Sequence, residues 1–364
     1  MSQAFPNPLQ SLPTHQGVIV VDGGLGTLLQ DHLDSSSPLA KAMWNASLIV
    51  THPSIIQDAH LQYLEAGAQI ITTATYQLSE TSIARAVELA TAEATPLPAD
   101  PPITPVGLMT VAIKAAIDAR EMYYARHPEA GTRVIAISMG STGAQLGGGR
   151  EYSGDYPGWS EERVASSWKS RLAQVREAAA ILGLSDFCLA IETVPSLSET
   201  RAIAQALTEP AHVHSGIWSI LSLVGSKLGE SSTGEPLPDL FSLLHPIPHL
   251  AAMGINCSPI SIALHPLLSS PSFPYSPALF CCPNGMVWDV QGCRWLEEPE
   301  EGNPQAGSDG AYTGPERWAA HLVRQVRSGS GPSPPLLLLG GCCMTTPAHI
   351  TALSRALSPI SHIV

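Results

Sequence analysis

Eight short apolar runs recur along the whole chain, and each is bounded by residues that favour turns. They cover residues 17–22, 68–74, 133–140, 187–193, 216–223, 250–257, 278–284 and 335–342. Because apolar residues follow one another in these runs without polar alternation, the runs are typical of strands that are buried on both faces. They therefore predict a parallel sheet covered by helices.

Segments with helical spacing lie between these runs. Predicted helices cover residues 53–66, 83–89, 106–124, 161–182 and 315–326. The last of them opens with Pro315, and proline is a favoured first residue of a helix. Strands and helices that alternate in eight units predict an α/β fold of the (β/α)8 TIM-barrel type. A doubly wound open sheet is the alternative that this pattern leaves open.

Three segments rich in proline or glycine interrupt the alternation. Residues 91–105 and 226–238 predict surface loops, and residues 292–314 predict an acidic loop insertion. None of them has the length or charge of an independent domain. We therefore expect a single domain over residues 1–364.

Charge and cysteine content narrow the class of protein. The formal charge of -13, from 18 Lys and Arg against 31 Asp and Glu, would repel phosphate backbones, so nucleic acid is not expected as a partner. The sequence has no apolar run long enough to cross a bilayer and no secretory signal at its start. Seven cysteines, an odd number, favour a reducing compartment over a disulfide framework. A cytoplasmic protein without a membrane partner is predicted.

Cysteines close two of the apolar runs. Cys257 ends the sixth run, and the adjacent Cys342 and Cys343 end the eighth. By spacing alone, burial of these thiols as small hydrophobic groups and binding of a metal are equally good interpretations. A barrel favours the metal, because the carboxyl ends of its strands form one face that holds the active site. Three thiolates with a free fourth position suit Zn²⁺, so we predict a zinc site on that face.

Two acidic residues also stand at strand ends. Asp22 closes the first run and Glu192 the fourth, and neither run contains a lysine or arginine. Each carboxylate alone could equally cap a helix or pair with a loop. Together on one face they favour recognition of a cation, such as the ammonium group of an amino acid. The glycines after Asp22 do not match a nucleotide-binding spacing, which argues against a nucleotide ligand.

Six motifs in this order resemble a known family. They are Asp22-Gly-Gly-Leu-Gly-Thr27, the run from Tyr63 to Gln77, Gly140-Ser-Thr-Gly-Ala144 with Glu151-Tyr-Ser-Gly-Asp-Tyr156, Glu192-Thr193, Gly254-Ile-Asn-Cys257 and Gly340-Gly-Cys-Cys343. Nearly the whole chain resembles the homocysteine S-methyltransferase family, in its branch that uses S-methylmethionine or S-adenosylmethionine. The resemblance implies a zinc-containing barrel that transfers a methyl group from a sulfonium donor to homocysteine and forms methionine.

The resemblance also implies roles for single residues. Cys257, Cys342 and Cys343 match zinc ligands, and Asp22 and Glu192 match acids that bind the homocysteine amino group. Further predicted substrate contacts are Gly23, Thr73 and Asn256. No protein side chain is expected to act as a catalyst beyond the zinc-activated thiolate of the substrate, because a sulfonium donor has a neutral leaving group and needs positioning more than a general acid.

Three positions depart from the family pattern, and two other functions remain open. Ala74 replaces an expected asparagine, and Met344 replaces an arginine that often follows the paired cysteines. Met286 lies where the family usually has a Ser-Gly-Glu continuation. All three are predicted near the mouth of the barrel. The first alternative is methyl transfer to another thiol or selenol, such as selenocysteine. The second is a barrel that binds amino acids or zinc without catalysis.

Overall fold

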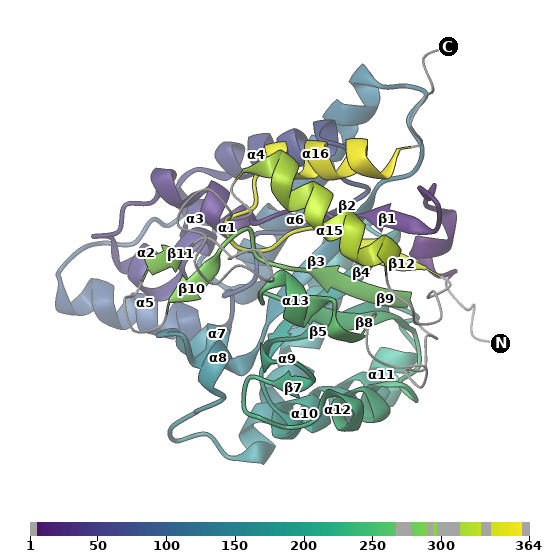
Figure 1. The fold of residues 1–364 in the computed structure, drawn as a ribbon. Coiled ribbons are helices and arrows are strands. Elements are labelled where there is room, and N and C mark those ends of the chain that lie inside the picture. The colour runs from purple at the N-terminus through teal and green to yellow at the C-terminus, as the bar shows by residue number, and fades with distance from the viewer. Residues whose placement is uncertain (1–5, 267–277, 290–293, 297–313, 329–335, 359–364) are drawn as a thin grey trace, which may run out of the picture.

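The computed structural model describes residues 6–266, 278–289, 294–296, 314–328 and 336–358 (Figure 1). Eight strands form one sheet in the order β1-β12-β9-β8-β5-β4-β3-β2, and every neighbouring pair is parallel. The strands are β1 (Val18–Val20), β2 (Ile70–Thr72), β3 (Val134–Gly140), β4 (Phe187–Val194), β5 (Trp218–Leu223), β8 (Leu250–Asn256), β9 (Ala278–Cys282) and β12 (Leu337–Leu339). Seven of them lie within predicted runs, and β4 extends one residue beyond the predicted run 187–193.

The sheet closes on itself. On one side, β1 pairs with β12. On its other side, Val21 forms a parallel bridge with Ile70 of β2, and the Asp22 amide donates to the Ile70 carbonyl at 3.0 Å. Closure confirms the predicted barrel and excludes the open sheet, because an open sheet would leave β1 or β2 without this second neighbour.

Side chains alternate between the barrel interior and the surrounding helices. Ile19 and Val21 belong to the interior cluster, whereas Val18 and Val20 pack in the cluster outside the sheet. Both clusters are apolar, which explains why the strand sequences do not alternate with polar residues. Leu9, from the 3-10 helix η1 (Pro8–Ser11), also packs into the interior cluster.

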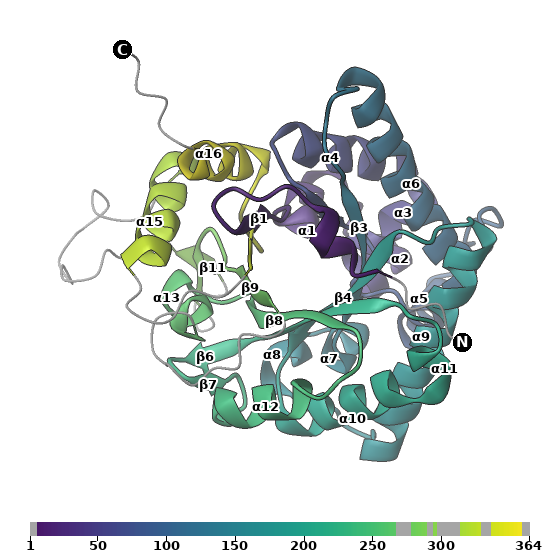
Figure 2. The ribbon, with the colours of Figure 1, turned by 90° about the vertical axis from the view of Figure 1, so that its right-hand side faces the viewer.

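Helices surround the sheet (Figure 2). The longer ones are α4 (Pro53–Glu65), α5 (Glu80–Ala92), α6 (Pro105–Arg126), α9 (Glu161–Ile181), α10 (Leu197–Thr208), α12 (Leu237–Leu244), α15 (Pro315–Ser328) and α16 (Pro347–Leu357). All five predicted helices are among them. No helix in the described part of the chain is long and apolar enough to span a bilayer.

Short elements fill the connections. They are the helices α1 (Leu25–Leu28), α2 (Pro38–Met43), α3 (Leu48–Thr51), α7 (Thr142–Leu146), α8 (Arg150–Ser153), α11 (Pro210–Val213) and α13 (Ile260–Ala263), the 3-10 turns η2 (Gln30–His32) and η3 (Trp44–Ser47), and the strand pair β10 (Val287–Asp289) and β11 (Arg294–Leu296). Two of these groups, α1–α3 after β1 and α7–α8 after β3, extend the carboxyl face of the barrel.

The loop expectations have mixed outcomes. Residues 93–104 lie between α5 and α6 without helix or strand, as predicted. The loop expected over residues 226–238 is wrong in part, because β6 (Gly225–Lys227) and β7 (Glu230–Ser231) form an antiparallel hairpin there and α12 starts at Leu237. Strands of two or three residues are too short to show a periodic pattern. The predicted insertion at 292–314 lies largely outside the described residues, which include only β11 and Gly314 of that range. Cys293 lies outside them as well.

Candidate functional site

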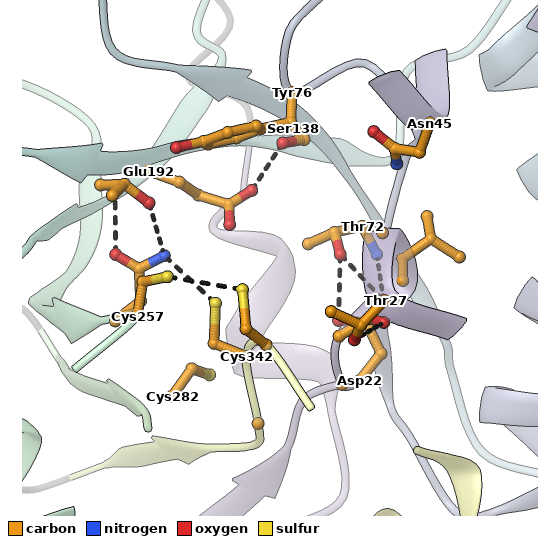
Figure 3. Close-up of a pocket in the computed structure, with 18 of the residues that line it drawn as sticks. Asp22, Thr27, Asn45, Thr72, Tyr76, Ser138, Glu192, Cys257, Cys282 and Cys342 are labelled. Carbon is orange, nitrogen blue, oxygen red and sulfur yellow. Dashed lines mark hydrogen bonds between the residues drawn. The ribbon is translucent and has the colours of Figure 1, made fainter. Parts of the chain in front are cut away.

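A cavity of about 410 Å³ opens at the carboxyl ends of the strands. Its lining comes from strand ends and from the connections after β1, β2, β3 and β9 (Figure 3). It includes Asp22, Gly23, Thr27, Trp44, Asn45, Thr72, Thr73, Tyr76, Ser138, Glu151, Tyr152, Glu192, Thr193, Asn256, Cys257, Phe280, Cys282, Trp295, Cys342 and Cys343. All eight predicted site residues therefore reach one cavity, although they span more than 300 positions of the sequence.

Three thiols meet in this cavity. The Sγ atoms of Cys257, Cys342 and Cys343 all lie within 4.8 Å of one another, and those of Cys257 and Cys343 are 3.6 Å apart. A tetrahedral ion with Zn–S bonds of about 2.3 Å places its sulfur ligands roughly 3.8 Å apart. The cluster is thus compact enough for one tetrahedral ion to reach all three sulfurs.

Backbone geometry at the strand ends brings the thiols together. Cys257 directly follows β8 and has φ 51°, a left-handed conformation that residues with a side chain rarely adopt. The Cys342 carbonyl accepts from the Thr345 hydroxyl, and the Cys343 carbonyl accepts from the Gly285 amide. Gly24 packs against the same turn, where a Cβ atom would lie 2.5 Å from the Cys342 carbonyl oxygen. A side chain at Gly24 would push the paired cysteines away.

The three thiols have shifted pKa values because they lie next to one another. Hydrogen bonds from the other two thiols lower the pKa of Cys257 well below its ordinary value. The bonds to Cys257 raise the pKa values of Cys342 and Cys343 well above theirs. The protein by itself therefore stabilises one thiolate, because three adjacent negative charges would repel one another. A bound divalent cation is the group that would let all three ionise.

Asp22 is held in the cavity wall by the second strand. Its carboxylate accepts from the Thr72 amide at 2.7 Å and from the Thr72 hydroxyl at 2.9 Å. Burial is the main cause that raises the pKa of Asp22 to about 8, against these hydrogen bonds. No ion pair of the described residues includes Asp22. The carboxyl group is thus buried without a cationic partner.

Glu192 lies above the thiol cluster in the view of Figure 3, on a different part of the cavity wall from Asp22. Its Oε1 accepts from the Ser138 hydroxyl at 2.6 Å. Burial raises its pKa to about 7, and Glu192 also belongs to no ion pair in the described ranges. A buried and a half-buried carboxyl group in one cavity, neither with a cationic partner in the described ranges, are arranged to receive a cationic ligand.

These raised pKa values predict a pH dependence of stability. In the unfolded chain, Asp22 and Glu192 release their protons near 3.8 and 4.5, but in the folded protein they hold them to about 8 and 7. The folded state therefore binds more protons in this window, and the two groups make the free energy of unfolding fall as the pH rises from about 4 to 8. Urea unfolding across this range should show that the free energy of unfolding depends less steeply on pH in the double variant Asp22→Asn, Glu192→Gln than in the wild type. An identical slope in both proteins would contradict the prediction.

Thr73 and Gly23, two further predicted substrate contacts, also contact neighbouring residues of the protein. The Thr73 hydroxyl pairs with the Thr75 hydroxyl at 2.7 Å and accepts from the Ser138 amide at 3.0 Å. Gly23 makes room for neighbouring side chains, since a Cβ atom there would lie 2.8 Å from the Thr345 hydroxyl oxygen and 3.0 Å from a Tyr63 ring carbon. Both residues line the cavity, and their contact with substrate stays a prediction.

Asn256 connects β8 to the end of β4. Its Oδ1 accepts from the Thr193 amide at 3.1 Å, and its Nδ2 donates to the Thr193 hydroxyl at 3.0 Å and faces the Cys342 sulfur at 3.9 Å. Thr193 has φ 59°, so Asn256 supports a second left-handed residue at the mouth. We interpret Asn256 as an organising residue of the site as well as a predicted substrate contact.

Sequence reasoning did not single out three residues that the structure brings to the cavity. The Tyr152 hydroxyl lies 3.1 Å from the Cys257 sulfur. Glu151 is buried, its Oε2 has no hydrogen-bond partner among the described residues, and burial raises its pKa. Tyr76 also lines the cavity and lies above Glu192 in the view of Figure 3. Glu151 and Tyr152 belong to a motif that supported the family resemblance, and this was the signal available.

The three departures from the family pattern lie outside the cavity lining. Ala74 is buried, Met286 is half-buried, and Met344 donates its backbone amide to the Thr27 hydroxyl at 3.1 Å. None of the three is among the lining residues in the described ranges. Met344 still has φ 63° beside the paired cysteines, so it shapes their turn through the backbone.

Comparison with known proteins agrees with the site. The homocysteine S-methyltransferase family matches residues 19–357. A homocysteine S-methyltransferase from Escherichia coli (strain K12) is 32% identical over 348 residues, 95% of this chain and 97% of that protein. A selenocysteine Se-methyltransferase from Brassica oleracea var. italica is 28% identical over 367 residues, 98% of this chain and 93% of that protein. The crystal structure of the metallated form of the homocysteine methyltransferase MmuM from Escherichia coli has a TM-score of 0.69 and 29% identity, and the match covers 96% of this chain and 99% of the other.

Proposed function

The chain belongs to the homocysteine S-methyltransferase family, and we propose that it transfers a methyl group from S-methylmethionine or S-adenosylmethionine to L-homocysteine, forming methionine. The observation that carries this function is the meeting, in one cavity, of three thiols and two carboxyl groups that form no ion pair with a described residue. The test is an assay of the purified protein with homocysteine and each donor, with methionine measured by mass spectrometry. No methionine with any donor would refute the proposal.

Zn²⁺ is the proposed metal, and Cys257, Cys342 and Cys343 are its proposed ligands. Thiolate ligands in a tetrahedral arrangement select zinc over harder cations such as Mg²⁺ or Ca²⁺. When bound, zinc would supply a position at which the acceptor sulfur is held as a thiolate near neutral pH. The Tyr152 hydroxyl, 3.1 Å from the Cys257 sulfur, adds a hydrogen bond to one ligand.

The carboxyl groups orient the acceptor. We propose that Asp22 and Glu192 bind its ammonium group, which would give both carboxylates a cationic partner. Thr72 and Ser138 fix the two carboxylates through hydrogen bonds and so limit how the ammonium group can lie. A thiol carried on the same molecule would then be directed toward the cysteine cluster, and this positioning replaces a search by diffusion.

The reaction requires little acid–base catalysis by the protein. The acceptor sulfur forms a bond to the donor methyl carbon, and the carbon–sulfonium bond breaks with its electron pair going to the departing thioether, which is neutral. The protein must align three atoms and keep water away. Trp44 and Phe280 give the cavity an apolar part that suits this task. No side chain needs to donate a proton to the leaving group.

We predict that S-methylmethionine is a better donor than betaine, with S-adenosylmethionine intermediate or slow. The basis is the resemblance of residues 140–144 and 151–156 to the sulfonium branch, together with an acidic cavity. Glu151 lies in this cavity with a carboxyl oxygen that has no partner among the described residues, and betaine has no ammonium hydrogens to offer it. Values of kcat/KM for the three donors at fixed homocysteine decide the order. A clear preference for betaine would overturn the choice of branch and leave the zinc proposal untouched.

Methyl transfer to selenocysteine is the second candidate function. The similarity to a selenocysteine Se-methyltransferase over 98% of this chain supports it. Selenocysteine has the same ammonium and carboxylate groups as homocysteine but a side chain shorter by one methylene. A direct competition between the two acceptors measures the preference. The third interpretation, a barrel without catalysis, has no such support, since the relatives described above are methyltransferases.

A further inference from the structure

Glu199 is a buried carboxylate that lies outside the cavity. It belongs to the first turn of α10 and is 1% exposed. Its Oε1 accepts from the Thr142 amide at 2.6 Å and from Trp168 Nε1 at 3.0 Å, and its Oε2 accepts from the Tyr156 hydroxyl. No ion pair of the described residues includes Glu199. Three neutral donors from three parts of the chain therefore bind its carboxylate, and the buried Arg171 guanidinium interacts with its charge through space.

Two of these donors mark the ends of one segment. Thr142 begins α7, and Tyr156 follows α8, so residues 142–156 are attached to Glu199 at both ends. Between the two ends, α8 carries Glu151 and Tyr152 into the cavity, where Tyr152 reaches the Cys257 sulfur.

The segment is packed as one unit. A Cβ atom on Gly143 of α7 would lie 2.2 Å from the Glu151 amide nitrogen and 2.3 Å from the Arg150 carbonyl carbon. Only glycine allows α7 and α8 to approach this closely. A shift at either end of the segment is therefore transmitted to Glu151 and Tyr152. Helix α10 itself follows β4, whose end carries Glu192, so Glu199 connects both walls of the site.

We propose that Glu199 is a positioning residue for methyl transfer: its carboxylate anchors residues 142–156 so that Glu151 and Tyr152 keep their places in the cavity. Glu199 does not line the cavity and acts through these two side chains. The kinetic part of this inference rests on the proposed function, whereas its structural part, the anchoring of residues 142–156, does not.

The first experiment compares three single variants. Glu199→Gln keeps the shape but removes the charge, and a small misplacement of site residues typically costs about 10²-fold in rate, so we expect kcat/KM to fall by about tenfold or more. Tyr156→Phe removes one contact and should cause a smaller loss in the same direction. Glu209→Gln is the matched control, because Glu209 lies at the other end of α10, is 40% exposed in its side chain and pairs with Lys169 at 2.5 Å. The control should keep the wild-type kcat/KM.

The second experiment separates positioning from general stabilisation. Glu199→Gln is combined with Tyr152→Phe, and if Glu199 acts through the segment, it should cost less in kcat/KM in the Tyr152→Phe background than in the wild type. Hydrogen exchange of the holoenzyme should be faster over residues 142–156 in Glu199→Gln and unchanged in the barrel strands. If Glu199→Gln does not fold, Tyr156→Phe takes its place in both comparisons.

Wild-type kcat/KM in Glu199→Gln, equal fold losses in both backgrounds, or unchanged exchange over residues 142–156 would each overturn the proposal. A wild-type protein that forms no methionine would instead refute the proposed function. In that case the hydrogen-exchange comparison still decides whether Glu199 anchors the segment.

Discussion

Replacing Cys257, Cys342 or Cys343 by alanine is expected to remove the metal and to lower methyl transfer by about 10²-fold or more, since even changes to residues behind metal ligands cost up to about 10²-fold. Each of the three sulfurs is within 4.8 Å of the other two, so loss of any one leaves a two-thiolate site. Without the metal, the acceptor thiol keeps a pKa of about 8.5 and is mostly protonated at neutral pH. Metal content by mass spectrometry of the intact protein and kcat/KM are measured on the same preparations.

Cys282→Ala is the matched control for these variants. Cys282 lines the same cavity but does not belong to the cluster of three thiols. It should retain one metal per chain, as is expected of the wild type. If a variant of one of the three cysteines keeps its full metal content, that cysteine is not a metal ligand. If the Cys282 variant loses the metal, Cys282 is a further ligand.

Replacing Asp22 by asparagine or Glu192 by glutamine is expected to raise the KM for homocysteine by about tenfold or more. A hydrogen bond to a charged group in an enclosed site is worth about 1.5–3 kcal/mol, and 1.4 kcal/mol corresponds to tenfold in affinity. The amides keep the shape and the bonds from Thr72 and Ser138 but lose the charge. Steady-state kinetics with homocysteine as the varied substrate measure the effect.

A substrate analogue without the amino group, 4-mercaptobutyrate, provides the control. If the carboxylates bind the ammonium group, the amide variants should lose little activity with this analogue compared with the wild type. Asp186→Asn serves as the protein control, because Asp186 is 62% exposed in its side chain and pairs with Arg120. Equal losses with both substrates, or an unchanged homocysteine KM, would contradict the assignment.

The predicted strands and helices were recovered because their signals are local. Each barrel strand is buried on both faces, so its residues are apolar in sequence wherever the chain goes next. The hairpin of β6 and β7 was missed for the opposite reason. Its pairing joins short polar segments, such as Lys227 with Glu230, that carry no pattern of their own.

The hydrogen-bond partners of the site residues could not be predicted from the sequence. Thr72 is 50 positions from Asp22, and Ser138 is 54 from Glu192, and nothing local marks either as the residue that fixes a carboxylate. The left-handed backbone of Cys257 and Thr193 is likewise invisible, since neither is a glycine. Glu199 has only a helix-start position in sequence, while its role depends on Thr142 and Tyr156.

By itself, the sequence favoured a barrel over an open sheet, placed its cysteines and acids at strand ends, and indicated the family. These properties depend on burial periodicity and on motifs, both of which are written in consecutive residues. Only the tertiary structure decided which side chains face the cavity, which carboxyl groups are left without a cation, and which distant residues hold them. Those properties depend on closure of the sheet, which brings β1 beside both β2 and β12 and so gives residues hundreds of positions apart the same low-dielectric surroundings.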